Sequence, residues 1–172
     1  DYIENIISMC SDYSIKYVMI GPETLLETDL VTSLEETGIK VFAPNKYLAQ
    51  IETNKGFLRD LFKNNNYEKF IPKYYILDEL SFTEDALKNV LDELNNDYVI
   101  KASGLNGGKG VKLSQSDLNN FDETLIYCRE IISKGQNIVI EEKLYGEEFS
   151  FHSIVRNGDC FHTFPIQDYK KL

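Results

Sequence analysis

The chain has 172 residues, of which 42% are hydrophobic and 12% aromatic, enough for the core of one medium-sized or two small globular domains. Its formal net charge of −10 disfavours a polyanionic partner, so we expect no binding to nucleic acid. Three scattered cysteines without a Cys-x-x-Cys pair indicate reduced thiols in a cytoplasmic protein, and since no apolar run approaches about 18 residues we expect neither a membrane span nor a signal peptide.

The N-terminal quarter of the chain has the pattern of a parallel α/β sheet. Apolar spacing predicts a helix, a strand, a helix and a strand, in that order, at residues 2–10, 17–20, 26–36 and 39–42. The short links between them favour parallel strands. Ligands of such sheets bind at the carboxyl ends of the strands, where Gly21-Pro22-Glu23 and Ala43-Pro44-Asn45 follow.

The remainder alternates helices with hairpin-like strands. Two helices are predicted over 45–54 and 54–63, followed by a polar loop. Ser81 and Glu84 fit a capping box, with Ser81 at the N-cap of a helix to about residue 94. A further helix begins at Ser116 or Asp117. Strands are predicted at 74–77, 98–101, 111–113, 138–140 and, after a hairpin turn at 156–159, at 160–166. This mixture is typical of an α+β fold.

A glycine-rich segment follows the strand that carries Lys101. Four glycines occur within seven residues, with a second lysine, Lys109, among them. A P-loop would need glycine where Ser103 stands and a hydroxyl where Gly110 stands, and a dinucleotide fingerprint starting at Gly108 would have to end in glycine at Leu113. The segment therefore indicates a phosphate-binding loop of another kind, with a flexible turn and solvated lysines as the alternative.

The two histidines, His152 and His162, lie on the strands of the predicted hairpin and could approach each other. Two histidines without a third ligand are more typical of sheet residues than of a metal site. We expect no metal-binding residues within the 172 residues of this chain.

Three features occur in order along the chain: Lys101 with the glycine segment, the apolar strand that leads into Glu141-Glu142-Lys143-Leu144, and Gly146-Glu147-Glu148-Phe149-Ser150. Together they resemble the ATP-grasp superfamily, and more narrowly the phosphoribosylamine–glycine ligase family. Other segments that resemble the family's motifs are Gly21-Pro22-Glu23, Phe42-Ala43-Pro44, residues 49–52 and 54–57, and Gln167-Asp168-Tyr169-Lys170-Lys171. The family usually has Asp at Ser103, Gly-Ser at Thr53-Asn54 and His at Tyr169.

The resemblance implies a role for each matching residue. Lys55 and Lys101 would neutralise the phosphates of ATP, and Glu148 would accept hydrogen bonds from the ribose hydroxyls. Gly107, Gly108, Lys109 and Gly110 would close over the triphosphate, and the backbone of Glu141, Glu142, Lys143 and Leu144 would read the adenine edge. Residues near the other substrates would be Gly21, Pro22, Glu23, Gln167, Asp168 and Lys170. Without the resemblance, Lys55 would be a solvated helix residue and Glu141-Glu142 a strand end facing water.

The resemblance also implies an α/β and α+β organisation. Residues 1–44 would end a parallel α/β domain, 45–72 would begin the ATP-grasp domain, 73–140 would form its small lid subdomain, and 141–172 would begin the larger one. Since the chain lacks an initiator Met and ends without a tail, we expect an internal fragment of a longer enzyme.

The implied activity is ATP-dependent ligation of glycine to 5-phosphoribosylamine in purine biosynthesis, with Mg²⁺ or Mn²⁺ held by residues downstream of 172. The fragment alone would bind nucleotide without completing the ligation. The alternatives are another ATP-grasp carboxylate–amine ligase or carboxylase, and a non-catalytic nucleotide-binding module.

Overall fold

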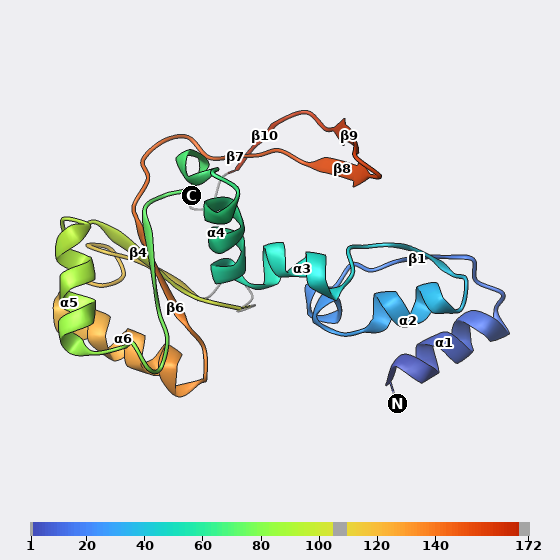
Figure 1. The fold of residues 1–172 in the computed structure, drawn as a ribbon, viewed down its shortest axis with the longest axis horizontal. Helices are drawn as coiled ribbons and strands as arrows, with labels where there is room; N and C mark the ends of the chain where they lie inside the picture. The colour runs from blue at the N-terminus through green and yellow to red at the C-terminus, as the bar shows by residue number, and fades with distance from the viewer. Residues whose placement is uncertain (1, 105–109, 169–172) are drawn as a thin grey trace.

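The N-terminal unit is a small α/β layer (Figure 1). The structure, a computed structural model, describes residues 2–104 and 110–168. Its first elements are α1 (Tyr2–Asp12), β1 (Tyr17–Met19), the 3-10 helix η1 (Glu23–Glu27), α2 (Leu30–Glu36) and β2 (Lys40–Phe42). β1 and β2 pair in parallel, with Val18 opposite Val41, which confirms the predicted parallel strands. Cys10, Leu30 and Leu34 form the buried centre of this layer.

The single helix predicted over 26–36 is wrong, because Thr28 interrupts it. Its hydroxyl donates to the carbonyl of Leu25 at 2.6 Å, and its backbone is extended (φ −101°, ψ 172°). A threonine hydroxyl that binds a nearby carbonyl competes with helix continuation in this way. The chain therefore ends η1 at Glu27 and restarts as α2 at Leu30.

Two asparagine-capped helices join the units. α3 (Lys46–Thr53) begins after Asn45, whose side chain accepts the N–H of Leu48, and α4 (Lys55–Asn64) begins after Asn54, whose side chain accepts the N–H of Phe57. Both caps satisfy a backbone donor that the first turn leaves free. The short 3-10 helix η2 (Glu68–Phe70) follows. The predicted helix pair is confirmed.

The second unit is built on an antiparallel sheet. β3 (Tyr74–Leu77), β6 (Ile138–Glu142), β4 (Tyr98–Ala102) and β5 (Val111–Leu113) lie in the order β3-β6-β4-β5. Helices α5 (Glu84–Glu93) and α6 (Phe121–Ser133) cover one face, and α4 lies on the other (Figure 1). Leu87, Leu91, Ile100, Cys128, Ile138 and Ile140 are among the residues buried between the sheet and these two helices.

Both helix starts in this unit differ from the prediction. Thr83 caps α5 by accepting the N–H of Ala86, whereas Ser81 exchanges hydrogen bonds with Asp78 in a turn before the helix. Asn120 caps α6 by accepting the N–H of Glu123, and the carboxylate of Asp117 instead accepts the N–H of Leu113. Ser81, Ser116 and Asp117 are therefore turn residues.

The last strands form a projecting hairpin. β8 (Ser153–Arg156) pairs antiparallel with β9 (Asp159–His162), and β7 (Phe149–Ser150) pairs with β10 (Ile166–Gln167). Asn157 and Gly158 both have positive φ (51° and 91°), as a type I′ turn requires, which confirms the predicted turn. The predicted return strand over 160–166 is broken between β9 and β10, where Pro165 supplies no backbone donor.

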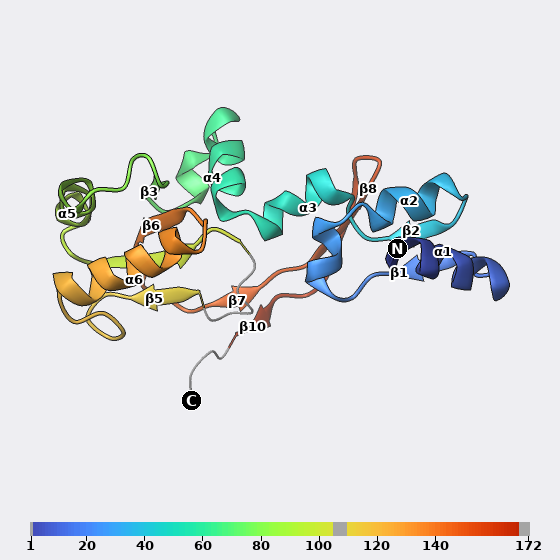
Figure 2. The same ribbon diagram turned by 90° about the horizontal axis from the view of Figure 1, so that it is seen from below.

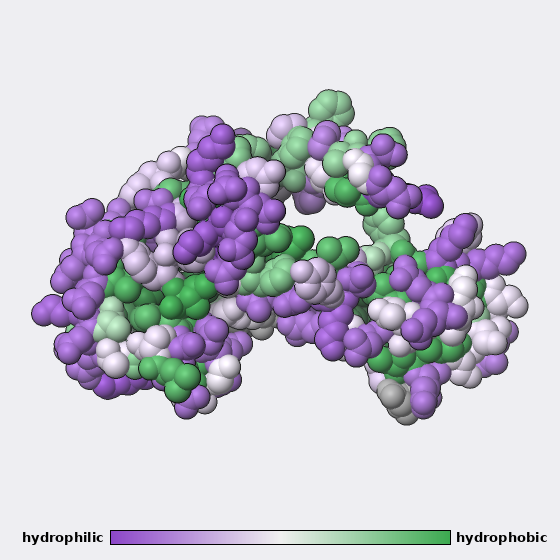
Figure 3. Space-filling view, viewed as in Figure 1, coloured by the Kyte–Doolittle hydropathy of each residue, from purple (hydrophilic) through white to green (hydrophobic). Residues whose placement is uncertain are grey.

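The hairpin extends from β7 and β10 toward the side of the N-terminal unit in both ribbon views (Figures 1 and 2). It exposes apolar side chains, including Phe161 and Phe164. The space-filling view shows the two units separated by a hollow below α3 (Figure 3). None of the helices within the described ranges is long and apolar enough to cross a membrane.

Candidate functional site

A buried carboxylate lies between two cations on the sheet face next to α4. Lys101 of β4 and Glu141 of β6 share this face because their neighbours Ile100 and Ile140 point into the core. The Lys101 Nζ lies 2.5 Å from Glu141 Oε2. Arg59 of α4 reaches Glu141 Oε1 with Nη2 at 2.5 Å and Nε at 2.6 Å. The Glu141 side chain is 2% exposed, that of Arg59 12% and that of Lys101 24%.

Lys55 adds a third cation beside this pair. It lies one turn before Arg59 on the same face of α4, and its Nζ donates to the carbonyl of Gly104 at 3.1 Å. Burial lowers the pKa of the Lys55 ammonium below its ordinary value, and Lys101 lowers that pKa further, whereas Glu52 and Glu141 oppose the shift. We call Lys55, Arg59, Lys101 and Glu141 the cation cluster. Three cationic groups and one carboxylate leave an excess of positive charge, which suits an anionic ligand.

The first turn of α4 is fixed to the sheet and to the strand end beyond Lys101. The Ser103 hydroxyl donates to Asn54 Oδ1 at 3.1 Å, so the residue that caps α4 also holds the end of β4. A Cβ added at Gly56 would lie 3.3 Å from Ile76 Cδ1 of β3, a tighter contact than most Cβ atoms make. The glycine therefore allows the close approach that brings Lys55 and Arg59 to the sheet.

The strip predicted to read adenine begins with the last two residues of β6, Glu141 and Glu142, and continues through Lys143 and Leu144. The N–H groups of Glu142 and Lys143 donate to the carbonyls of Lys73 and Asp97, so these two donors are used within the protein. The Glu142 carboxylate accepts the N–H of Lys73 at 2.8 Å. Leu144 is 69% exposed. The strip therefore shares Glu141 with the cation cluster and ends at the exposed Leu144.

A second group of predicted residues meets at the pair of β7 and β10. Gln167 lies opposite Phe149, next to Glu148, and the N–H of Asp168 donates to the carbonyl of Glu148 at 3.0 Å. The Asp168 carboxylate accepts the Ser150 hydroxyl at 2.8 Å. Glu148, Gln167 and Asp168, distant in the sequence, are therefore neighbours in space.

The remaining predicted positions belong to neither group. Gly110 is the last glycine of the glycine segment, and its carbonyl accepts the N–H of Ala102 next to Lys101. Gly21, Pro22 and Glu23 are exposed at the start of η1. Gly107, Gly108, Lys109 and Lys170 lie outside the described residues.

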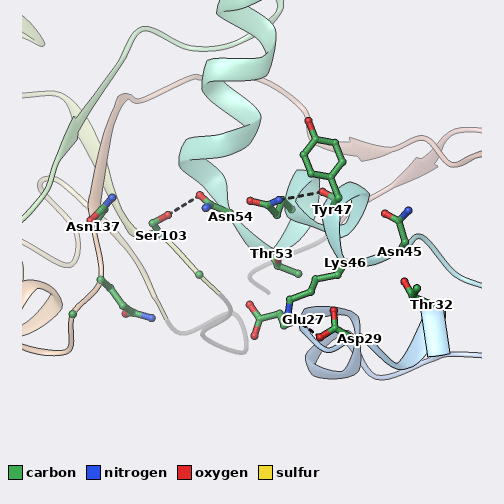
Figure 4. A pocket seen from close by; sticks show the side chains of 14 residues that line it. Glu27, Asp29, Thr32, Asn45, Lys46, Tyr47, Thr53, Asn54, Ser103 and Asn137 are labelled. Carbon is green, nitrogen blue, oxygen red and sulfur yellow. Dashed lines mark hydrogen bonds and ion pairs between the residues drawn. The ribbon is translucent and has the colours of Figure 1, made fainter. Parts of the chain in front are cut away.

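A cleft of about 870 Å³ lies between the two units (Figure 4). Asp29 and Lys46 form an ion pair in its wall at 3.4 Å. Gly21, Pro22 and Glu23 are not among its described lining residues. Those residues are Glu27, Asp29, Thr32, Asn45, Lys46, Tyr47, Gln50, Thr53, Asn54, Ser103, Gly104, Gly135, Gln136 and Asn137.

The histidines of the hairpin have ordinary sheet contacts. His162 Nδ1 lies 2.8 Å from the Ser153 hydroxyl, and its ring stacks on Phe151. Within residues 2–104 and 110–168, no group of three or more His, Cys, Asp or Glu side chains could hold a metal ion.

Sequence reasoning missed Arg59 and the Asn54–Ser103 contact. Arg59 lies 82 residues from Glu141, so no local pattern links them. Its position four residues after Lys55 was the available signal, because the two side chains must share a helix face.

Two family models match the chain. The phosphoribosylglycinamide synthetase N domain matches residues 1–52, and the phosphoribosylglycinamide synthetase ATP-grasp (A) domain matches residues 53–172. The chain is 38% identical over 154 residues to the phosphoribosylamine–glycine ligase of Methanococcus maripaludis, covering 88% of this chain and 34% of that protein. It therefore spans about a third of the length of this curated relative.

Solved structures agree with these matches. The phosphoribosylamine–glycine ligase of Thermotoga maritima superposes with a TM-score of 0.63 at 26% identity, covering 90% of this chain and 36% of that one. The D-alanine–D-alanine ligase of Bacillus anthracis, complexed with ATP, superposes with a TM-score of 0.65 at 16% identity over 99% of this chain and 58% of that one. At this lower identity the second likeness concerns the fold alone.

Proposed function

The chain belongs to the phosphoribosylglycinamide synthetase family of ATP-grasp ligases, and on that premise we propose that it forms the nucleotide-binding part of an enzyme that joins glycine to 5-phosphoribosylamine. In this reaction the glycine carboxylate attacks the γ-phosphate of ATP, which gives glycyl phosphate and ADP. The amine of phosphoribosylamine then displaces phosphate and forms the amide.

The cation cluster is the single observation that carries this proposal. Lys101 lies near the end of β4, before the glycine segment, and Lys55 Nζ donates to the carbonyl of Gly104 at the start of that segment. Both ammonium groups lie near the Glu141 carboxylate, which Arg59 also contacts. A triphosphate is the anion that matches this excess of charge. Glu148 would hold the ribose, and the strip from Glu141 to Leu144 would face the adenine.

The protein's contribution to the reaction is position and charge neutralisation. Groups fixed by helix caps and sheet pairing hold the phosphates where charge is redistributed, without reorganising during the reaction. Bound Mg²⁺, or Mn²⁺, would share the phosphate charge, with its ligands outside this segment. Gly21, Pro22, Glu23, Gln167, Asp168 and Lys170 remain candidates for contact with the other substrates.

A cytoplasmic location accords with the cysteines of the chain. Cys10 and Cys128 are buried and unpaired, and burial raises the pKa of the Cys128 thiol to about 12.

We propose domain boundaries at 44/45, 72/73 and 140/141. They divide the chain into the parallel domain, the helical start of the ATP-grasp domain, its small lid subdomain and its larger subdomain.

An ADP-release assay on the full-length protein that carries this chain tests the proposed reaction. With ATP and Mg²⁺ present, we expect ADP release only when glycine and 5-phosphoribosylamine are both supplied. Release supported instead by D-alanine or by bicarbonate would contradict the proposed substrates and favour another ATP-grasp activity.

The lowered pKa of Lys55 predicts an alkaline loss of ATP affinity. The ammonium binds phosphate only while protonated, and its pKa lies below the ordinary lysine value, so affinity should fall as the pH rises through that lowered pKa. Above about pH 8 the phosphates of ATP no longer titrate, so a change of ATP affinity with pH reflects the titration of groups on the protein.

Isothermal titration from pH 8 upward measures this effect. Lys55→Arg should flatten the decline, because a guanidinium keeps its charge over this range. Lys88→Arg, on the exposed side of α5, is the matched control and should retain the decline. Equal pH dependence in the wild type and Lys55→Arg would exclude Lys55 as the titrating group.

A further inference from the structure

We propose that Arg59 is a positioning residue for nucleotide binding, which keeps the positive charge of Lys101 available to an incoming phosphate without touching that phosphate. This inference rests on the proposed nucleotide function. No sequence pattern assigned a role to Arg59, and its described ion pair is with the Glu141 carboxylate.

The geometry divides the Glu141 carboxylate between two donors. Oε2 accepts only from Lys101 among the contacts described for the cluster, whereas Oε1 accepts two N–H groups from Arg59. Burying a carboxylate until it is only 2% exposed is costly unless charged and hydrogen-bonding partners such as these surround it. Arg59 therefore supplies two hydrogen bonds to Oε1 of Glu141 and one positive charge that balances the carboxylate.

The charge balance shows what Arg59 adds. Lys101 and Glu141 alone would form a neutral pair, and an arriving phosphate would have to separate them. With Arg59 in place the carboxylate is already compensated, so the charge of Lys101 is in excess. The exposures agree with this division, because the Lys101 side chain is 24% exposed and that of Arg59 only 12%. Lys101 is thus the more accessible partner and Arg59 the supporting one.

The position of Arg59 on α4 couples this support to Lys55. The two residues share one helix face, and Gly56 brings the first turn of that helix against β3. Helix α4 therefore carries Lys55, a candidate for phosphate binding, and also Arg59, which balances the carboxylate next to the second candidate, Lys101. A change at Arg59 should affect binding through charge alone if the helix stays in place.

Comparing ATP with adenosine separates a charge effect from a structural one. In the full-length protein, Arg59→Met should weaken ATP binding by about tenfold or more, by loss of one nearby positive charge, and leave adenosine binding within about twofold. The ATP effect should shrink as the salt concentration rises. Arg59→Lys, which keeps the charge, should recover most of the affinity. Lys88→Met removes the same charge from the opposite side of the sheet and should leave ATP binding unchanged.

A double variant tests whether the effect of Arg59 on ATP affinity comes from charge. Arg59→Met with Glu141→Gln removes one positive and one negative charge, so the cluster regains its original excess and ATP affinity should rise above that of Arg59→Met alone. Equal weakening of ATP and adenosine by Arg59→Met, or no recovery in the double variant, would overturn the positioning role. If the wild type binds adenosine but shows no added affinity for ATP, the proposed nucleotide function fails with it; if the wild type binds ATP and Arg59→Met does so equally well, only this inference fails.

Discussion

Glu141→Ala is expected to lower the free energy of unfolding by about 2–4 kcal/mol, because it leaves two cations facing each other without their countercharge. Arg59 and Lys101 both approach the removed carboxylate within hydrogen-bonding distance, and the carboxylate itself is buried. The expected loss lies toward the lower part of the range for broken buried pairs, because both cations keep some contact with water.

Urea denaturation followed by far-ultraviolet circular dichroism measures this loss. Glu142→Ala is the matched control. Glu142 is the next residue of the strand, its carboxylate accepts the N–H of Lys73 at 2.8 Å, and it lies nearer the surface than Glu141. Its loss should be about 1 kcal/mol. Equal losses for the two variants would mean that the buried ion pairs contribute nothing beyond an ordinary hydrogen bond.

Ile140→Ala should cost about 3–4 kcal/mol through a different mechanism. Ile140 is fully buried in β6, an inner strand of the sheet, opposite Tyr75 on one side and Ile100 on the other. Alanine removes apolar contacts there and leaves a cavity that the surrounding strands cannot close. The change lies on the core face, so ATP affinity of the folded protein should not change.

The control for this variant is Ile126→Ala, which truncates an isoleucine that is 58% exposed on α6. Its loss of stability should be below about 1 kcal/mol. The same urea experiment, with ATP titrations on the folded variants, compares the two. A clear fall in the ATP affinity of folded Ile140→Ala, with none in Ile126→Ala, would show that the two faces of β6 are not energetically separate.

The sequence predicted most strands because alternating apolar residues such as Ile100 and Ile140 define a buried face regardless of context. The sequence specified the first residues of the helices less clearly than it specified the strands. Ser81 and Thr83, two residues apart, are both good caps, and so are Asp117 and Asn120, three residues apart, so the packing of α5 and α6 on the sheet decides between them. Local patterns offered several satisfactory choices, and only tertiary contacts selected one.

The candidate site was predictable in part for a similar reason. Lys101 and the glycines that follow it form a local pattern, and the resemblance to a ligase family supplied Lys55 and Glu148. The buried state of Glu141 was not predictable, since a strand-end carboxylate normally faces water. Its burial depends on Arg59, which reaches it from 82 residues away along the chain.

Titration of ATP into the full-length protein and its Lys101→Met variant tests the central claim most directly. Loss of a charged hydrogen bond to phosphate should weaken binding by about 10- to 100-fold, while Glu141 keeps Arg59 as a partner and the fold remains intact. ATP binding by the wild type that is weakened to this extent in the variant is the result that the account predicts. ATP binding that is unchanged by Lys101→Met would contradict it and place the nucleotide, if it binds, elsewhere on the protein.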